Sequence, residues 1–268
     1  MKTNPLKKVS QKIKNFRLTR GVFAWPYVLF LTVFVVLPLV IILVNAFLAD
    51  GKLSFANFIA LAKDGASIKV LINSIFIGAV TTILCLAIGY PVAYTLANMK
   101  TGSIIVILFL LPMWVNFLVR TLAARAVFEA LSIPLGEGTV LFGMVYNYIP
   151  FMILPLHTTL TNIDKSFGEA AADLGADRVT VFLKVTLPLS VPGIISGIIM
   201  VFIPTISTFA ISQLLGGVHL FGDSIHEKFI HGLYGVGSVM SLIMLAFVLL
   251  SNMLLKKFNK GEAKASIW

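Results

Sequence analysis

Two short segments near the C-terminal end carry residue types that could do chemistry. In His226-Glu227-Lys228-Phe229-Ile230-His231 the two histidines are five positions apart. Zinc binding from one helix face needs histidines four positions apart, and a spacing of five turns the imidazoles about 140° away from each other. Ser238 follows Gly235-Val236-Gly237, but no histidine is placed to activate it. We therefore expect no metal site and no catalytic residue here.

Nucleotide chemistry is excluded on the same grounds. No segment matches G-x-x-x-x-G-K-[ST], the loop whose backbone cradles nucleotide phosphates. Any ATP and Mg²⁺ must therefore be bound by a partner, and we expect no cofactor in this chain. The single cysteine, Cys85, lies within an apolar run and is expected to pack as a small hydrophobic residue.

Most of the sequence consists of long apolar runs. Of the 268 residues, 58% are hydrophobic and 12% are charged, about half of the ~25% charged residues in a soluble domain. Six runs without Asp, Glu, Lys or Arg each approach or exceed the ~20 residues that cross a ~30 Å hydrocarbon core. They are residues 21–49, 70–99, 101–119, 138–163, 185–222 and 229–255. The sequence predicts an all-α integral membrane protein with six transmembrane helices.

The basic residues predict which side each end occupies. With both termini in the cytoplasm, 15 of the 21 Lys and Arg residues fall on the inner side and 6 on the outer side, as the positive-inside rule requires. We expect a basic cytoplasmic N-terminus (1–21), a membrane domain (22–255) and a basic cytoplasmic tail (256–268). This asymmetry, together with attraction to anionic membrane lipid, accounts for the net charge of +10. Nucleic-acid binding is therefore not needed to explain why the chain is basic.

The fifth run is long enough to raise the question of a seventh helix. Pro188, Pro192 and Pro204 are expected to break it up, and a seventh span would place the basic tail outside. None of the six runs contains a charged residue, and only His157, His219 and His231, all toward run ends, can titrate near neutral pH. Secondary carriers place such groups along their ion pathways, so an energy source outside this polypeptide is favoured.

The inner loop between the fourth and fifth runs predicts two short amphipathic helices. Ser166, followed three residues later by Glu169, has the spacing of a capping box that begins a helix. Gly175 supplies a left-handed stop, and Asp177 can cap a second helix from 178 to 187 that ends at Pro188. The alanines at 170–172 permit close approach, so the loop is typical of a docking element.

This loop resembles the EAA loop, the cytoplasmic coupling segment of ABC importer permeases. The match comprises Glu169-Ala170-Ala171, Gly175 and Val185-Thr186-Leu187-Pro188, with Val185 where the family usually has Ile. The resemblance implies the type I importer permease architecture, with a coupling loop at about 164–188. The residues expected to contact the ATPase are Glu169, Ala170, Ala171, Gly175, Asp177, Leu187 and Pro188.

Further segments resemble the permeases of spermidine/putrescine importers, among them Asn73-Ser74, Gly89-Tyr90-Pro91, Leu111-Pro112-Met113-Trp114 and Leu215-Gly216-Gly217. The family implies a bacterial cytoplasmic membrane protein that pairs with a second, homologous permease subunit, two ATPase subunits and an extracytoplasmic substrate-binding protein. Related permeases carry ferric iron, sulfate or molybdate, so these substrates stay open. A stand-alone secondary carrier is the alternative from another class.

A protonated polyamine can be held by carboxylates, by carbonyl oxygens or over aromatic rings. Because the apolar runs hold no carboxylate, we expect aromatic side chains to carry more of the pathway. The candidates are Trp114, beside Asn116, and Tyr90 and Tyr146, for which helix packing is the alternative. The outer acids Asp223 and Glu227 could attract cations at the mouth or contact the binding protein, or be solvated loop charges.

Overall fold

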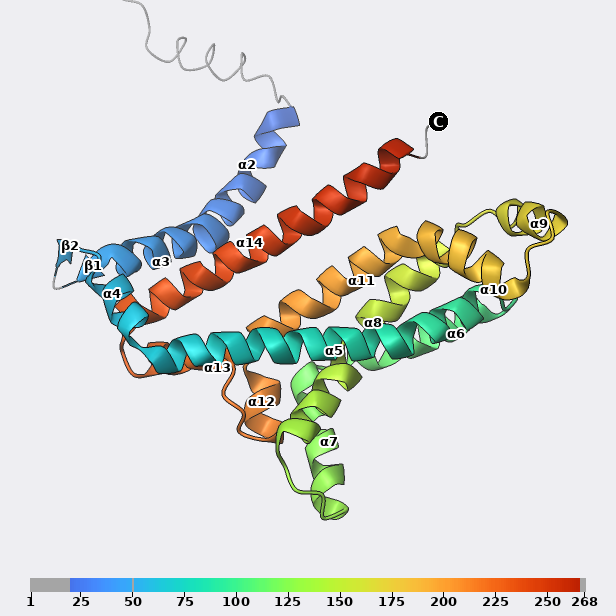
Figure 1. The fold of residues 1–268 in the computed structure, drawn as a ribbon. Coiled ribbons are helices and arrows are strands. Elements are labelled where there is room, and N and C mark those ends of the chain that lie inside the picture. Colours follow the sequence, from blue (N-terminus) through green and yellow to red (C-terminus); the bar gives the residue numbers. More distant parts are fainter. Residues whose placement is uncertain (1–19, 50, 266–268) are drawn as a thin grey trace, which may run out of the picture.

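The computed structural model of the chain describes residues 20–49 and 51–265, with side chains described over 24–49 and 51–253. It is a bundle of long helices (Figure 1). Most of the predicted basic N-terminal segment, and the last three residues of the predicted tail, lie outside the described residues. The side chains of 256–265 lie outside them too.

Five helical segments are long and apolar enough to cross a membrane. The first joins α2 (Arg20–Leu31), a π-helical turn η1 (Thr32–Val36) and α3 (Leu37–Phe47); the others are α5 (Gly65–Ala97), α8 (Glu137–Thr161), α11 (Leu187–Ser207, continuous with the turn before it) and α14 (Tyr234–Ala265). The prediction of an all-helical membrane protein is confirmed. A two-residue hairpin, β1 (Leu48–Ala49) with β2 (Lys52–Leu53), is the sole sheet within the described ranges.

The centre of the bundle is formed by α5, α8 and α11, which lie side by side (Figure 1). Cys85 is fully buried there with Met152, Leu156 and Val201, as a small hydrophobic residue should be. Helices α8 and α11 approach closely at Gly197, where a Cβ atom would stand 2.5 Å from the Met152 sulfur. Glycine is therefore needed at this position. Small residues at helix interfaces are the usual solution where no hydrophobic effect drives helices together within lipid.

The third predicted span is not one straight helix. Residues 102–114 form α6 (Gly102–Leu110) and a 3-10 turn η2 (Leu111–Trp114), and α7 (Phe117–Ala130) then leaves at 89°. The first arm, 13 residues long, reaches only about 20 Å at 1.5 Å per residue. Val115 is extended and the Asn116 side chain accepts the Leu118 N–H at 2.8 Å, which caps a new helix. The apolar run 101–119, in which Pro112 predicts a kink, therefore bends sharply just after Trp114, and the two arms together can form the sixth span.

The prolines of the fifth run do not break it, contrary to expectation. Helix α10 (Arg178–Val181) continues through a π-helical turn η3 (Phe182–Thr186) into α11, and Pro192 and Pro204 lie within α11. Pro188 stands at the start of α11, directly after the π turn. A proline lacks the N–H that would bond four residues back and clashes with that carbonyl; the wider π turn relieves this clash. The first span repeats the arrangement, with η1 before Pro38.

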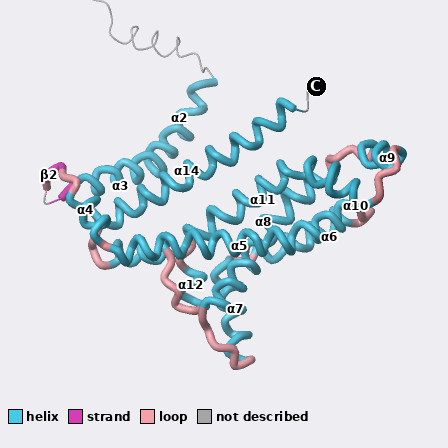
Figure 2. Tube along the Cα trace, in the orientation of Figure 1, coloured by secondary structure: helices cyan, strands magenta, loops and turns pink. Residues whose placement is uncertain are grey.

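Short elements close the two ends of the bundle. At one end are α4 (Ala56–Lys63) and α13 (Phe221–Ile230), and at the other α9 (Ser166–Asp173) and α10 lie beside the connection between α5 and α6 (Figures 1 and 2). The short α12 (Ala210–Leu215) contacts α7 and α8. This separation agrees with a chain that crosses the membrane an odd number of times between the hairpin and the loop that holds α9 and α10.

The topology prediction can be tested with single cysteines at two exposed positions, Lys63 in α4 and Lys165 before α9. We expect an impermeant maleimide to label Lys63→Cys in intact cells and Lys165→Cys only after permeabilisation, because positive charge is retained in the cytoplasm. Buried Cys85 should give no background. Labelling in the reverse order would overturn the assignment of sides.

Candidate functional site

The predicted coupling segment begins at Asp164. Its carboxylate accepts the Ser166 N–H at 2.9 Å, and the N-cap of α9 is Lys165. The predicted capping box with Ser166 as N-cap is therefore wrong by one residue. The aspartate two positions earlier can already satisfy the first free N–H groups of the helix. Hydrogen bonds from Ser166 hold the pKa of the Asp164 carboxyl below its usual value.

The turn between the two short helices has the predicted geometry. Gly175 has φ +87°, the left-handed conformation that favours glycine. Gly175 donates to Ala172 O and Ala176 to Ala171 O, which completes a Schellman motif. Asp177 then caps α10 by accepting the Thr180 N–H at 3.2 Å, and hydrogen bonds from the side chain and the backbone of Thr180 lower the pKa of the Asp177 carboxyl. Both predicted roles, the glycine stop and the aspartate cap, are confirmed.

Helix α9 presents an exposed face. None of its residues is buried, Glu169 and Ala170 are exposed, and Leu174 just after it is 90% exposed. This face is therefore accessible to a protein partner. The other two predicted coupling residues, Leu187 and Pro188, lie apart from this face at the start of α11. Five of the seven predicted coupling residues therefore lie in α9 and the turn after it, and the other two lie in the first turn of α11.

Tyr90 lies near this coupling segment and not near the break in the third span. Its hydroxyl is 2.8 Å from the Ser190 hydroxyl of α11, and its ring meets Phe182 of η3 edge-on at 5.9 Å. The tyrosine therefore ties α5 to the start of α11, as the packing alternative predicts.

A cavity of about 630 Å³ opens where the third span breaks. Three segments line it: the break itself, the middle of α8 and the end of α11. Trp114 and Asn116, both predicted for the pathway, line it together, and Trp114 is 87% exposed. The remaining lining residues are Met113, Val115, Phe117, Arg120, Asn147, Tyr148, Phe151, Pro204, Ser207, Thr208 and Phe209.

Arg120 and Asn147 are the polar groups of this cavity that sequence reasoning did not select. Arg120 is only 8% exposed, and its guanidinium carbon stands 5.9 Å from the ring centre of Tyr146. Asn147 donates to Gly143 O at 2.8 Å and to the Thr121 hydroxyl at 3.2 Å. A signal existed: Asn116 and Arg120 are four residues apart, on one helix face. Tyr146, the third predicted aromatic, does not line the cavity but contacts Arg120, which does.

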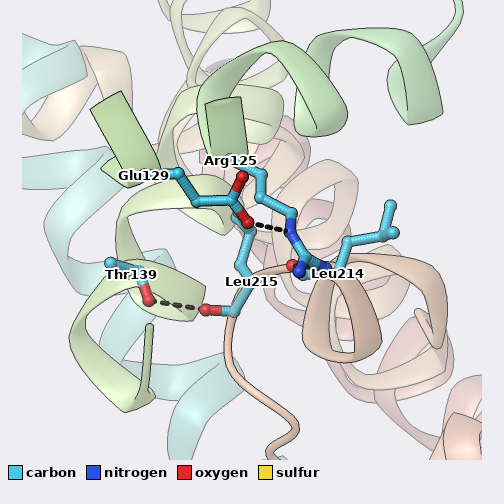
Figure 3. Close-up of polar contacts among 5 residues, drawn as sticks. All are labelled: Arg125, Glu129, Thr139, Leu214 and Leu215. Atoms are coloured by element: carbon cyan, nitrogen blue, oxygen red, sulfur yellow. Dashed lines mark hydrogen bonds and ion pairs between the residues drawn. The ribbon is translucent and has the colours of Figure 1, made fainter. Parts of the chain in front are cut away.

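Helix α12 is held against α7 and α8 by side chains that reach its last carbonyls (Figure 3). Arg125 pairs with Glu129 at 2.7 Å and donates to Leu214 O at 3.2 Å. Thr139 donates to Leu215 O at 2.6 Å. Unsatisfied carbonyls at a helix end need such partners. The contacts fix the link from α11 to α12, whose Thr208 and Phe209 form one wall of the cavity.

Asp223 is not a solvated loop charge. It is 2% exposed, and one carboxylate oxygen accepts from the Leu220 N–H at 2.9 Å and from the Ser212 hydroxyl. It therefore joins α12 to the start of α13. Burial raises the pKa of the Asp223 carboxyl, against the opposing effect of these bonds. Glu227, one turn further along, is exposed. Of the two acids predicted for the mouth, Glu227 is therefore the one that is open to solvent.

Asp223→Ala should lower the free energy of unfolding by about 1–3 kcal/mol, because it leaves buried donors without an acceptor. Asp223→Asn should cost less, since its amide oxygen can still accept. A raised pKa in the folded state contributes stability that is present at acid pH and lost as pH rises through the folded pKa. Thermal unfolding of purified protein from pH 4 to 7 should therefore show a smaller loss of stability in Asp223→Asn than in wild type. Parallel curves for the two proteins would contradict this.

Comparison with protein families decides the assignment. Residues 89–264 match the family described as "Binding-protein-dependent transport system inner membrane component". The chain belongs to this family. It is an ABC importer permease, a multi-pass protein of the inner membrane, and it is not itself catalytic. ATP is bound by the partner ATPase of such a system.

Among curated relatives, the permease is similar to the spermidine/putrescine transport system permease protein PotB from three organisms. It is 30% identical to PotB of Salmonella typhimurium (strain LT2) over 246 residues, which cover 82% of this chain and 86% of that one. It is 31% identical to PotB of Escherichia coli (strain K12), over 75% of this chain and 83% of the relative. It is 32% identical to PotB of Haemophilus influenzae, over 78% of this chain and 81% of the relative.

Solved structures share the fold of this permease. A chain of a bacterial ABC transporter involved in the import of the acidic polysaccharide alginate matches with a TM-score of 0.71 at 13% identity, over 93% of this chain and 99% of that chain. A chain of the methionine ABC transporter MetNI, in an inward-facing form, matches with a TM-score of 0.59 at 16% identity, over 72% and 94%. The type I importer permease fold predicted above is confirmed.

Proposed function

We propose that this permease is the membrane subunit of an ATP-driven importer of polyamines, spermidine or putrescine. The observation that carries the proposal is the identity of about 30% to PotB permeases along most of both chains. The cavity at the broken span supports it, because an exposed indole lines it without a neighbouring carboxylate. A protonated amine gains about 0.5–2 kcal/mol over such a ring.

The proposed assembly contains this permease, a second homologous permease, two ATPase subunits and an extracytoplasmic binding protein. The exposed face of α9 supports an ATPase contact, since Glu169, Ala170 and the segment up to Asp177 project from the bundle. In the proposed cycle, the ATPase pair closes on ATP, the two coupling loops move together, and the cavity turns from the inner to the outer side. The binding protein then delivers the substrate.

Uptake into proteoliposomes tests the proposal. The complete complex, with its binding protein, should accumulate labelled spermidine or putrescine only when ATP is supplied to the ATPase side. Ferric iron, sulfate and molybdate serve as competitors from the alternative substrate classes. Accumulation of one of these in place of polyamines would overturn the substrate proposal. Uptake by this chain without any ATPase would overturn the assembly and favour a stand-alone carrier.

A further inference from the structure

We infer that Arg120 pairs with a carboxylate of the second permease subunit, at the open side of the cavity. The inference rests on the heteromeric assembly proposed above. It concerns a contact between subunits and does not depend on which substrate is carried.

The charge of Arg120 is permanent and unmatched within the described side chains. A guanidinium stays protonated at every relevant pH. The residue is more than nine-tenths buried, and its Nε and Nη1 atoms have no hydrogen-bond acceptor. Beside it in the cavity, the Asn147 amide oxygen also lacks a donor. The Tyr146 ring offers a cation–π contact at 5.9 Å, which cannot replace an anionic partner for a desolvated charge.

The acids on α7 and α13 do not compensate Arg120. Glu129 pairs with Arg125 on the next turn of α7. One oxygen of Asp223 accepts from Ser212 and Leu220 and its other oxygen is unpartnered, but Asp223 does not line this cavity. No ion pair to Arg120 is formed in the part of the chain that the structure describes. Because no carboxylate among the described side chains neutralises Arg120, we place the compensating carboxylate on the second permease.

The open side of the cavity suits a protein partner. Trp114 and Val115, next to the guanidinium in the cavity lining, are 87% and 47% exposed. Lipid on this side would leave the charge of Arg120 uncompensated, which is costly in hydrocarbon. A cationic substrate cannot compensate this charge either, and its passage over Trp114 requires that the guanidinium be neutralised by another group. A carboxylate on the facing permease would neutralise the guanidinium, and its planar oxygens match the forked N–H donors.

A charge-swap experiment on the purified complex tests this contact. Arg120→Glu is combined with the replacement by Arg, one at a time, of each Asp and Glu in the membrane domain of the second permease. We expect Arg120→Glu alone to lower the thermal midpoint of the complex by about 5–15 °C and to reduce co-purification of the two permeases. One swap should restore both. Arg120→Lys should retain part of the stability, and exposed Lys69→Glu is the matched control without effect.

Two outcomes would overturn the inference. The first is that no swap restores the midpoint. The second is that sodium acetate raises the midpoint of the wild-type complex but not that of Arg120→Gln, which would assign the site to a soluble anion. Because the readout is stability and assembly, a restoring swap supports the contact even if the complex transports no polyamine. Failure of the proposed substrate is thereby distinguished from failure of the contact.

Discussion

Gly175→Val should reduce ATP-driven uptake about tenfold or more while the membrane domain stays folded. Gly175 has φ +87°, and a β-branched residue in the left-handed region costs roughly 1–2 kcal/mol. Nothing lies within 4 Å of the Cβ that valine would add, so backbone strain alone is responsible. The turn would rearrange and misplace α9 against the ATPase. Uptake, thermal midpoint and co-isolation of the ATPase are measured together.

The chain supplies a matched control at Gly51. It has φ +75° and equally open surroundings, but it lies in the hairpin at the other end of the bundle. Gly51→Val should carry similar strain and leave uptake near normal. Gly175→Asn should retain part of the activity, because asparagine tolerates the left-handed region. Equal loss at 51 and 175 would show that strain anywhere in the chain is enough, and would remove the coupling role.

Reversing the charge of Glu169 examines the same face without touching the backbone. Glu169→Lys should block uptake and weaken ATPase co-isolation at unchanged stability, since the side chain is exposed and makes no contact that the fold needs. Cysteines placed at 170–176 should cross-link to the ATPase. Cross-linking to the extracytoplasmic binding protein instead would refute the coupling assignment.

Trp114→Leu should lower polyamine uptake about 2- to 30-fold, which is the effect of losing a cation–π contact of about 0.5–2 kcal/mol. Trp114→Phe should keep part of the uptake, because phenyl retains a weaker ring quadrupole. With 87% exposure of Trp114, neither change should alter folding stability. Initial uptake rates in proteoliposomes provide the measurement. Affinity of the separate binding protein for substrate should be unchanged.

Trp25→Leu is the control for losing an exposed tryptophan. Trp25 is 68% exposed in the first span, far along the chain from the cavity. Its replacement should leave uptake unaffected. Equal losses in Trp114→Leu and Trp114→Phe would indicate shape alone, and normal uptake in the leucine variant would exclude Trp114 from the pathway.

Local rules were enough to predict the class of membrane protein and the helix ends around Gly175 and Asp177. Hydropathy over 20 residues depends only on neighbours in the chain, so five spans could be placed without tertiary information. The left-handed Gly175 and the Asp177 cap follow from residue type and spacing, because a helix end is satisfied by atoms two or three residues away. The same locality misplaced the other cap, since Asp164 and Ser166 compete for the same N–H groups.

Only the tertiary structure decided the break in the third span and the fate of the polar groups around it. Hydropathy cannot distinguish a straight helix from two arms at 89°, because both are equally apolar. Asp223 and Glu227 look alike as outer acids, but Ser212, eleven residues earlier, and the Leu220 N–H draw only Asp223 inside. Arg120 stands one residue beyond an apolar run, and its burial depends on Tyr146 and Asn147 of another helix. Burial is set by which distant segments pack together, and that information is spread over the whole chain.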